Sequence, residues 1–284
     1  MTNQIIVQLN PDVPPTGSDL GIVNAARKSF GRRSEWEHLT KGEVDYYGDL
    51  VEYVKLKDKD KRLLEFLARG MTADDFDAFI YSVATEGQDV KESGFDGNDV
   101  NLLKESLWQW RNTPTHDTPF NHGFFSFEIK APVFVNRHAV KHEYLVMSEY
   151  SRRYITDDVE FYTPDVWRKA AKDVKQGSSD EGVDIDLHEF ERDGYYSSYD
   201  FIALEEYKRL LKEGVAPEQA RMVLPQSLMT SWTWSGTLGA FANMCKLRLS
   251  KDTQYETRLV AQGVYAELKK QFPISAPLLV EGVL

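Results

Sequence analysis

Long stretches with helical spacing of apolar residues dominate the last third of the chain, and they do most to limit the possible folds. These stretches cover residues 198–213, 217–229, 232–247 and 253–271. Strand patterns are shorter: they cover residues 4–9 and residues 123–131, where Phe125, Phe127 and Ile129 fall on one face. Together these patterns predict an α+β fold, in which several long helices pack with a small antiparallel sheet.

Residues with strong local preferences mark where other elements begin and end. Ser18 or Asp19 is a candidate N-cap for a short helix, and Gly70 is the predicted stop of a helix over residues 57–70. Pro132 ends the second strand and can begin a helix. The polar stretch 172–194 is predicted to be a loop.

Composition excludes several classes of function. Lys+Arg 34 against Asp+Glu 45 gives a net charge of −11, which repels nucleic-acid backbones but allows a local basic pocket. The single cysteine, Cys245, rules out internal disulfides and Cys-rich zinc sites, and we expect it to be buried and inert. The chain has no apolar run long enough for a membrane span and no signal-peptide pattern at its start, so we expect a cytoplasmic protein.

Common catalytic motifs are missing. The chain has no phosphate-binding P-loop, no dinucleotide-binding GxGxxG between a strand and a helix, and no GxSxG nucleophile turn. His142-Glu143 and His188-Glu189 both lack the second histidine of a HExxH zinc motif, so no metal site is expected. No linker composition divides the chain, which predicts a single domain over residues 1–284.

The densest basic cluster is residues 137–154, which contains four arginine or lysine residues, two histidines and two serines: Arg137, His138, Lys141, His142, Ser148, Ser151, Arg152 and Arg153. Arginine forks and hydroxyl groups together can hold a phosphate. The alternative is a solvated charged surface with ion pairs to Glu143 and Glu149.

A second cluster lies in residues 218–256, where Arg221 and Arg248 stand among apolar and aromatic residues. A guanidinium in such surroundings needs an anion or an acceptor, because burying an unpaired charge is unfavourable. The alternative is an internal salt bridge to Glu218 or Glu256.

Several collinear blocks resemble the flavin-dependent thymidylate synthases. The blocks are residues 22–31, 116–137, 141–154, 160–168 and 218–234. The family signature, Arg-His-Arg followed by seven residues and Ser, is here Lys141-His142-Glu143 followed by seven residues and Ser151. Residues 71–113 look like an insertion, either a surface decoration or a cap and subunit contact.

The resemblance implies a reaction: reductive methylation of dUMP to dTMP. Methylenetetrahydrofolate gives the carbon, NADPH reduces FAD, and FAD supplies the hydride. No cysteine attacks the base, so the developing ring anion needs electrostatic stabilisation. The resemblance also implies a homotetramer with active sites shared between subunits.

The resemblance further implies roles for particular residues. Arg248, His116 and His142 are the implied catalytic residues, with Arg248 stabilising negative charge on the pyrimidine. The implied substrate-binding residues are His138, Lys141, Glu149, Ser151, Arg152, Arg153, Arg221, Arg248 and Gln254. The implied FAD-binding residues are Ser29, Thr118, Asn121, Lys141, His142, Glu143, Tyr144, Thr237, Asn243 and Leu247.

Four positions depart from the family pattern. Glu143 replaces an arginine, Thr237-Leu238-Gly239 stands in place of Asn-x-Arg, Asn121 replaces a glutamate, and His138 replaces a glutamine near the base. These changes keep two alternatives open. One is C5 modification of another pyrimidine, such as dCMP methylation or dUMP hydroxymethylation; the other is a catalytically silent nucleotide-binding homologue.

Overall fold

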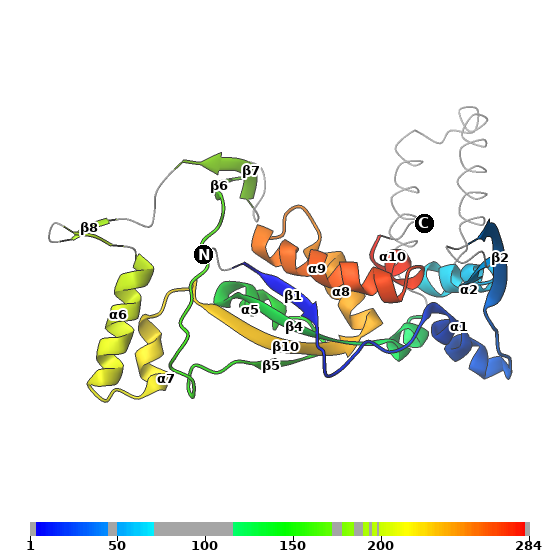
Figure 1. The fold of residues 1–284 in the computed structure, drawn as a ribbon, viewed down its shortest axis with the longest axis horizontal. Helices are drawn as coiled ribbons and strands as arrows, with labels where there is room; N and C mark the ends of the chain where they lie inside the picture. The colour runs from blue at the N-terminus through cyan, green and yellow to red at the C-terminus, as the bar shows by residue number, and fades with distance from the viewer. Residues whose placement is uncertain are drawn as a thin grey trace, which may run out of the picture. The chain divides into compact units, whose positions relative to one another are not determined.

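A computed structural model describes residues 4–44, 50–70, 116–171, 178–184, 190–192, 195–197 and 199–281 (Figure 1). The chain divides into two compact units. The first unit comprises Met1–Pro14, Ser126–Gly236 and Leu247–Val264, and the second comprises Pro15–Phe125, Thr237–Lys246 and Tyr265–Leu284. The single domain stays a prediction, and the insertion at residues 71–113 lies outside the described residues.

A four-stranded sheet in the order β1-β4-β10-β5 is the main sheet of the fold (Figure 1). The strands are β1 (Ile6–Leu9), β4 (Phe124–Pro132), β10 (Met229–Thr237) and β5 (Leu145–Glu149). β1 is antiparallel to β4, and β5 is antiparallel to β10 with Met147 opposite Trp234. This small antiparallel sheet together with the helices confirms the predicted α+β class.

Strand β10 corrects one predicted helix. Residues 232–237 are strand, and α8 (Leu238–Arg248) begins only after them. Within β10, Trp232 and Trp234 are buried while Thr233 is only partly so, which is the two-residue alternation of a strand. Short apolar runs fit both periods, and here the aromatic and β-branched residues favoured the strand.

Helices of the first unit are α5 (Val133–Ala139), α6 (Tyr199–Lys212), α7 (Pro217–Ala220) and the first part of α9 (Tyr255–Gln271). A Cβ on Gly263 of α9 would lie 2.7 Å from Cβ of Val7, so glycine permits the close approach of α9 to β1. The predicted helix over 217–229 is wrong beyond a 3₁₀ turn at Arg221–Val223. Leu224 precedes a proline and is extended, which ends the helical run.

The predicted loop over 172–194 is wrong where two hairpins form. β6 (Trp167–Ala170) pairs with β7 (Ser178–Val183), and β8 (Phe190–Arg192) pairs with β9 (Tyr195–Ser197). β7 buries none of its residues fully, so a polar sequence suffices for it and gives little signal of a strand. No helix within the described ranges is both long and apolar enough to cross a membrane.

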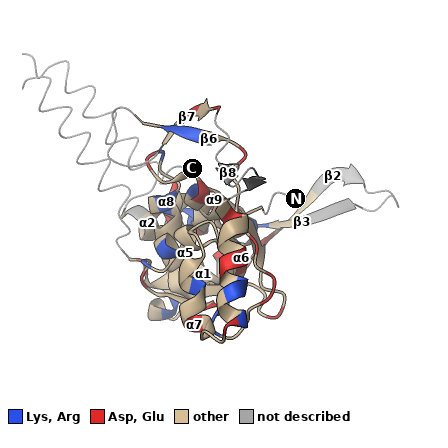
Figure 2. Cartoon of the chain, turned by 90° about the vertical axis from the view of Figure 1, so that its left-hand side faces the viewer, with Lys and Arg blue, Asp and Glu red and all other residues tan. Residues whose placement is uncertain are grey.

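The surface of α6 carries mixed charges, visible as blue and red positions along the helix (Figure 2). Arg209 pairs with Glu206 at 2.6 Å and with Glu213 at 2.7 Å, one turn apart on the same face. Such exposed pairs within one helix contribute only about 0.3–0.5 kcal/mol each. This face is a solvated surface on which the Arg209 charge is already paired.

The second unit contains α1 (Asp19–Arg27), β2 (Glu37–Val44), β3 (Leu50–Lys55), α2 (Asp58–Arg69) and α10 (Ser275–Val280). A 3₁₀ turn, η3 (Thr118–His122), precedes β4. Two predicted boundaries are confirmed: Ser18 caps α1 by accepting the Gly21 N–H at 3.1 Å, and Gly70 ends α2 with φ +78°. The rings of Phe125, Phe241 and Phe272 pack together in its core.

Candidate active site

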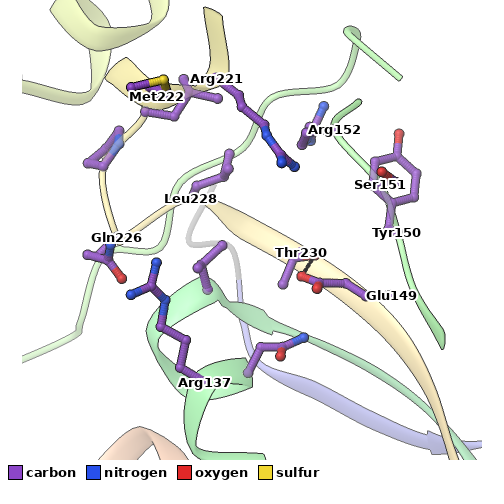
Figure 3. Close-up of a pocket in the computed structure, with 14 residues that line it drawn as sticks. Arg137, Glu149, Tyr150, Ser151, Arg152, Arg221, Met222, Gln226, Leu228 and Thr230 are labelled. Carbon is purple, nitrogen blue, oxygen red and sulfur yellow. Dashed lines mark hydrogen bonds between the residues drawn. The ribbon is translucent and has the colours of Figure 1, made fainter. Parts of the chain in front are cut away.

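A cavity of about 520 Å³ opens in the first unit beside α5 and the end of β5 (Figure 3). Its walls combine polar and apolar side chains: Val133, Asn136, Arg137, Glu149, Tyr150, Ser151, Arg152, Arg221, Met222, Leu224, Pro225, Gln226, Leu228 and Thr230. The cavity therefore brings together residues from the two clusters that the sequence singled out, 137–154 and 218–256.

Arg221 lies on the 3₁₀ turn at the rim of this cavity, and its side chain extends toward Arg152 (Figure 3). Its Nε–H makes one long hydrogen bond, 3.4 Å, to the backbone oxygen of Glu218. The carboxylate of Glu218 instead lies 3.5 Å from Arg153. Within the described part of the chain, the alternative of an Arg221–Glu218 salt bridge is therefore not realised, and the Arg221 charge has no acidic partner.

Arg152 is buried, and its guanidinium holds the turn that follows it. Its terminal N–H groups donate to the backbone oxygens of Asp157 and, at 2.7 Å, of Asp158. Asp158 has φ +52°, a left-handed conformation that these bonds help to keep. These carbonyl groups accept from the two terminal nitrogens, whereas the buried Nε of Arg152 has no hydrogen-bond partner within the described residues, and the positive charge stays uncompensated. Arg137 lines the cavity as well, so three guanidinium groups with no carboxylate partner among the described residues share it, which favours an anion inside.

Serine and acid groups complete the polar wall. The Oγ of Ser151 accepts a 3.3 Å hydrogen bond from the Arg153 backbone N–H, which leaves its own O–H free to donate. Thr230 donates to the carboxylate of Glu149 at 3.0 Å. Glu149 is the one acid among the lining residues given above. Its carboxylate can accept a hydrogen bond from a hydroxyl group of a ligand.

A second polar group lies outside the walls of this cavity and is centred on Arg248. The Nε–H of Arg248 donates to Nε2 of His142 at 2.9 Å, and the His142 ring lies 6.2 Å from that of Trp234. Because arginine keeps its proton, His142 must be neutral with its own proton on Nδ1. Burial, and then the charge of Arg248, lower the pKa of His142 to about 4.

His138 belongs to the same group. Its Nδ1 lies 2.8 Å from Oγ1 of Thr257, and burial followed by the Arg248 charge lowers its pKa. Burial also lowers the pKa of Arg248. In the described ranges, Arg248 is not paired with Glu256, which was the alternative interpretation of this arginine. Its partner is an imidazole that leaves the positive charge intact.

The other predicted residues of the first unit lie on its surface. Lys141, Glu143 and Tyr144 form the exposed turn before β5, and Tyr144 has φ +62°. Leu247 is 56% exposed at the end of α8, and Gln254 is half-buried before α9. Among the described residues, neither Glu143 nor Glu149 forms the ion pair that the surface alternative required.

The remaining predicted residues belong to the second unit. They are Ser29, His116, Thr118, Asn121, Thr237 and Asn243, and each is at least partly accessible. Two departures from the family pattern are in contact: Thr237 donates to Oδ1 of Asn121 at 2.7 Å, and a Cβ on Gly239 would lie 2.7 Å from the same oxygen. Asn121 and Gly239 therefore fit each other, and a side chain at position 239 would have to displace the amide.

Sequence reasoning missed several lining residues. Arg137 was noted in the basic cluster but not assigned to the site, and Asn136, Gln226 and Thr230 were not considered. A signal existed for Asn136, which is the one polar residue in the stretch Ala131–Asn136 of an otherwise apolar helix start. In the described ranges, no three His, Cys, Asp or Glu side chains are placed to hold a metal ion.

We expect the imidazole of His142 to stay neutral from about pH 8 down to about pH 5, because its folded-state pKa is about 4 against 6.5 for an ordinary histidine. The unfolded chain takes up this proton first as the pH falls. His142 therefore contributes stability above pH 6.5 that is lost as the pH falls toward 4. NMR titration of labelled histidines, with His142→Gln for assignment, measures this; a His142 midpoint near 6.5 would contradict the arrangement.

Comparison with known proteins gives a consistent family. The model of the family Thy1, "Thymidylate synthase complementing protein", matches residues 14–274. A flavin-dependent thymidylate synthase of Thermus thermophilus is 35% identical over 175 residues, which cover 60% of this chain and 61% of that protein. A flavin-dependent thymidylate synthase of Thermosipho africanus is 32% identical over 206 residues, covering 72% of this chain and 85% of the relative.

A solved structure shares the fold. It is the UMP/dUMP methylase PolB from Streptomyces cacaoi bound with 5-Br UMP, with a TM-score of 0.60 and 21% identity, covering 98% of this chain and 95% of the other. The family match extends over nearly the whole chain and includes the cavity and the Arg248 group. The chain therefore belongs to Thy1, the thymidylate synthase complementing proteins, as its resemblance to flavin-dependent thymidylate synthases predicted.

Proposed function

We propose that this protein is a flavin-dependent thymidylate synthase that binds dUMP in the cavity and methylates it at C5. The observation that carries the proposal is the pair of guanidinium groups, Arg152 and Arg221, that share the cavity without an acidic partner in the described chain. The phosphate of a nucleoside monophosphate would supply an anion for these two guanidinium groups. Family membership then favours dUMP over other nucleotides.

The phosphate would lie against Ser151 and Arg221, which both have N–H or O–H groups free to donate. Arg153 follows on the same turn, but its guanidinium lies 3.5 Å from Glu218 and would have to leave that pair to reach a ligand. Arg152 already donates one N–H from each terminal nitrogen to a backbone oxygen, so we propose that it acts on the phosphate mainly through its charge. Glu149 remains able to accept from a sugar hydroxyl.

Arg248 would stabilise negative charge on the pyrimidine ring. His142 holds its Nε–H, so the terminal guanidinium nitrogens stay available, and the neutral His142 does not cancel the charge. Cys245 cannot serve as a nucleophile, because it is fully buried and burial raises the pKa of its thiol. Activation of C5 then depends on electrostatic stabilisation, for which a preorganised cation is suited.

The exposed groups around His142 fit a flavin in type. Tyr144, two residues after His142, is 84% exposed, and Leu247, next to Arg248, is 56% exposed, so both provide apolar surface for a flat ring. Lys141 offers a cation for the diphosphate. In the second unit, the hydroxyl and amide groups proposed to bind FAD are those of Ser29, Thr118, Asn121, Thr237 and Asn243. FAD, when bound there, supplies the hydride.

Glu143 adds a negative charge beside Lys141, which weakens the attraction of these residues for the FAD diphosphate. We therefore propose that FAD is held mainly by neutral donors. His116 is proposed as a catalytic residue, and Gln254 and His138 as contacts to the base. Methylenetetrahydrofolate, NADPH and a homotetrameric assembly complete the proposal.

Replacing Arg221 with alanine should weaken dUMP binding by about 10- to 100-fold, because a charge-assisted hydrogen bond to phosphate contributes about 1.5–3 kcal/mol. Calorimetric titration with dUMP measures this. Arg209→Ala is the matched control: it removes the same charge from the same unit, on the exposed face of α6. Equal affinity of Arg221→Ala and the control would contradict the phosphate site.

The activity itself is tested with purified protein. We expect a yellow protein that converts dUMP to dTMP in the presence of methylenetetrahydrofolate and NADPH, identified by mass spectrometry with dUMP, UMP and dCMP in parallel. A methylated cytosine or a hydroxymethyl product would overturn the assignment in favour of another pyrimidine modification. A protein that binds dUMP but takes up no FAD would show a nucleotide-binding homologue without this chemistry.

A further inference from the structure

Asn136 is a buried polar residue whose amide nitrogen has no partner among the described residues. It lies on α5, on the face that also buries Val135 and Ala139, and it is 6% exposed. Its Nδ2 is enclosed and makes no hydrogen bond within the described structure. Its backbone oxygen accepts the Val140 N–H, so the unsatisfied group belongs to the side chain.

An unpaired buried amide is unusual, because about nine in ten buried polar groups have a partner. Leaving such a donor unpaired destabilises the folded state relative to an apolar residue of the same size. Asn136 also lines the 520 Å³ cavity, together with Val133 and Leu228. A side chain that is unsatisfied in the free protein and borders a binding cavity is suited to a partner that enters with the ligand.

We propose that the Asn136 amide donates a hydrogen bond to an oxygen of the nucleoside part of the bound nucleotide and is thus a specificity-determining residue. This inference rests on the proposed function, which places dUMP in the cavity. The phosphate is assigned to Arg152 and Arg221, whose side chains approach each other (Figure 3). Asn136 lines the cavity from α5, together with the apolar Val133 and Leu228 and with its neighbour Arg137, and so is assigned to the nucleoside part.

The contact predicts opposite effects on the free and the bound protein. Asn136→Leu keeps the branching and the number of side-chain heavy atoms and removes an unpaired polar group, so the free protein should melt at the same temperature or higher. Asn136→Ala should bind dUMP about 10-fold more weakly, the usual effect of losing one neutral hydrogen bond to a ligand. A structural asparagine would give the reverse, with lower melting temperatures and unchanged affinity.

The experiment measures melting temperature and calorimetric affinity on the full chain for wild type, Asn136→Ala, Asn136→Leu and Asn136→Asp. The matched control is Gln219→Ala, which removes an exposed amide in the same unit outside the cavity. The probes are dUMP, UMP, 2′,3′-dideoxy-UMP and inorganic phosphate. We expect Asn136→Ala to weaken all nucleotides that keep the contacted oxygen, and to leave inorganic phosphate binding unchanged.

The arms also identify the oxygen. If Asn136→Ala loses the same affinity for dUMP and for dideoxy-UMP, the contacted oxygen belongs to the pyrimidine ring. If it loses affinity only for nucleotides with a sugar hydroxyl, the contacted oxygen belongs to the sugar. Both results support the inference. An Asn136→Ala variant that binds dUMP as tightly as Gln219→Ala, or that loses inorganic phosphate to the same extent, overturns it while the nucleotide site stands. If wild type binds none of the nucleotides, the proposed function fails as well.

Discussion

Arg248→Ala should lower the turnover number for dUMP methylation by about 100- to 1000-fold, the effect of removing one preorganised group that stabilises an anionic transition state. The reason is geometric as well as electrostatic. His142 fixes the Nε of Arg248 at 2.9 Å, so the guanidinium is oriented before the substrate binds. Rapid-quench measurement of dTMP formation, with dUMP affinity measured separately, distinguishes loss of chemistry from loss of binding.

The companion variants make this test specific. Arg248→Lys keeps the charge but loses the planar fork, so we expect partial activity between wild type and alanine. Arg209→Ala, on the solvated face of α6, should leave turnover unchanged. The pKa of His142 is about 4 in the wild type, and it should be higher in the Arg248→Ala variant, because the neighbouring positive charge is gone. If Arg248→Ala turned over dUMP as fast as wild type, Arg248 would not stabilise negative charge on the pyrimidine ring in this protein.

Local sequence signals predicted the elements that have clear starts and stops. The cap at Ser18, the terminal Gly70 and the proline at 132 each act within a few residues, so the sequence was enough to place α1, α2 and the junction of β4 with α5. β10 was misread as helix, because its role as a strand depends on pairing with β5, which is distant in the chain. Tertiary pairing overrides local periodicity in such runs.

The site shows the same division. The basic cluster at 137–154 and Arg221 were identified from composition, and the cavity brings several of their residues together. The sequence could not show that Arg248 bonds to His142, 106 residues away, or that Arg152 uses its terminal donors on backbone oxygens. The unpaired amide of Asn136 was equally hidden, because burial and the lack of a partner are properties of the folded chain.

The largest stability effect is expected at Asp19, which is 2% exposed in the second unit. Its carboxylate accepts the backbone N–H groups of Ile274, at 3.0 Å, and Ser275, at 2.9 Å, where α10 begins. The Ser275 hydroxyl donates to it as well. Asp19 therefore caps α10 from 256 residues away in sequence, and it links the first helix of the chain to the last one described.

We expect Asp19→Ala to lower the free energy of unfolding by about 3 kcal/mol, because it leaves buried donors unpaired. Asp19→Asn keeps the shape of the side chain and should lose less stability.

Burial, partly offset by the bonds to Ser275 and Ile274, raises the pKa of Asp19 above 3.8. The folded state thus binds this proton more tightly, so the advantage of wild type over Asp19→Asn should be greatest below pH 3.8 and decline as the pH rises through the raised pKa. Urea unfolding of the three proteins between about pH 4 and pH 8 measures both effects. An Asp19→Ala protein as stable as wild type would show that this carboxylate does not hold α10, and an advantage over Asp19→Asn that grows with pH would contradict the raised pKa.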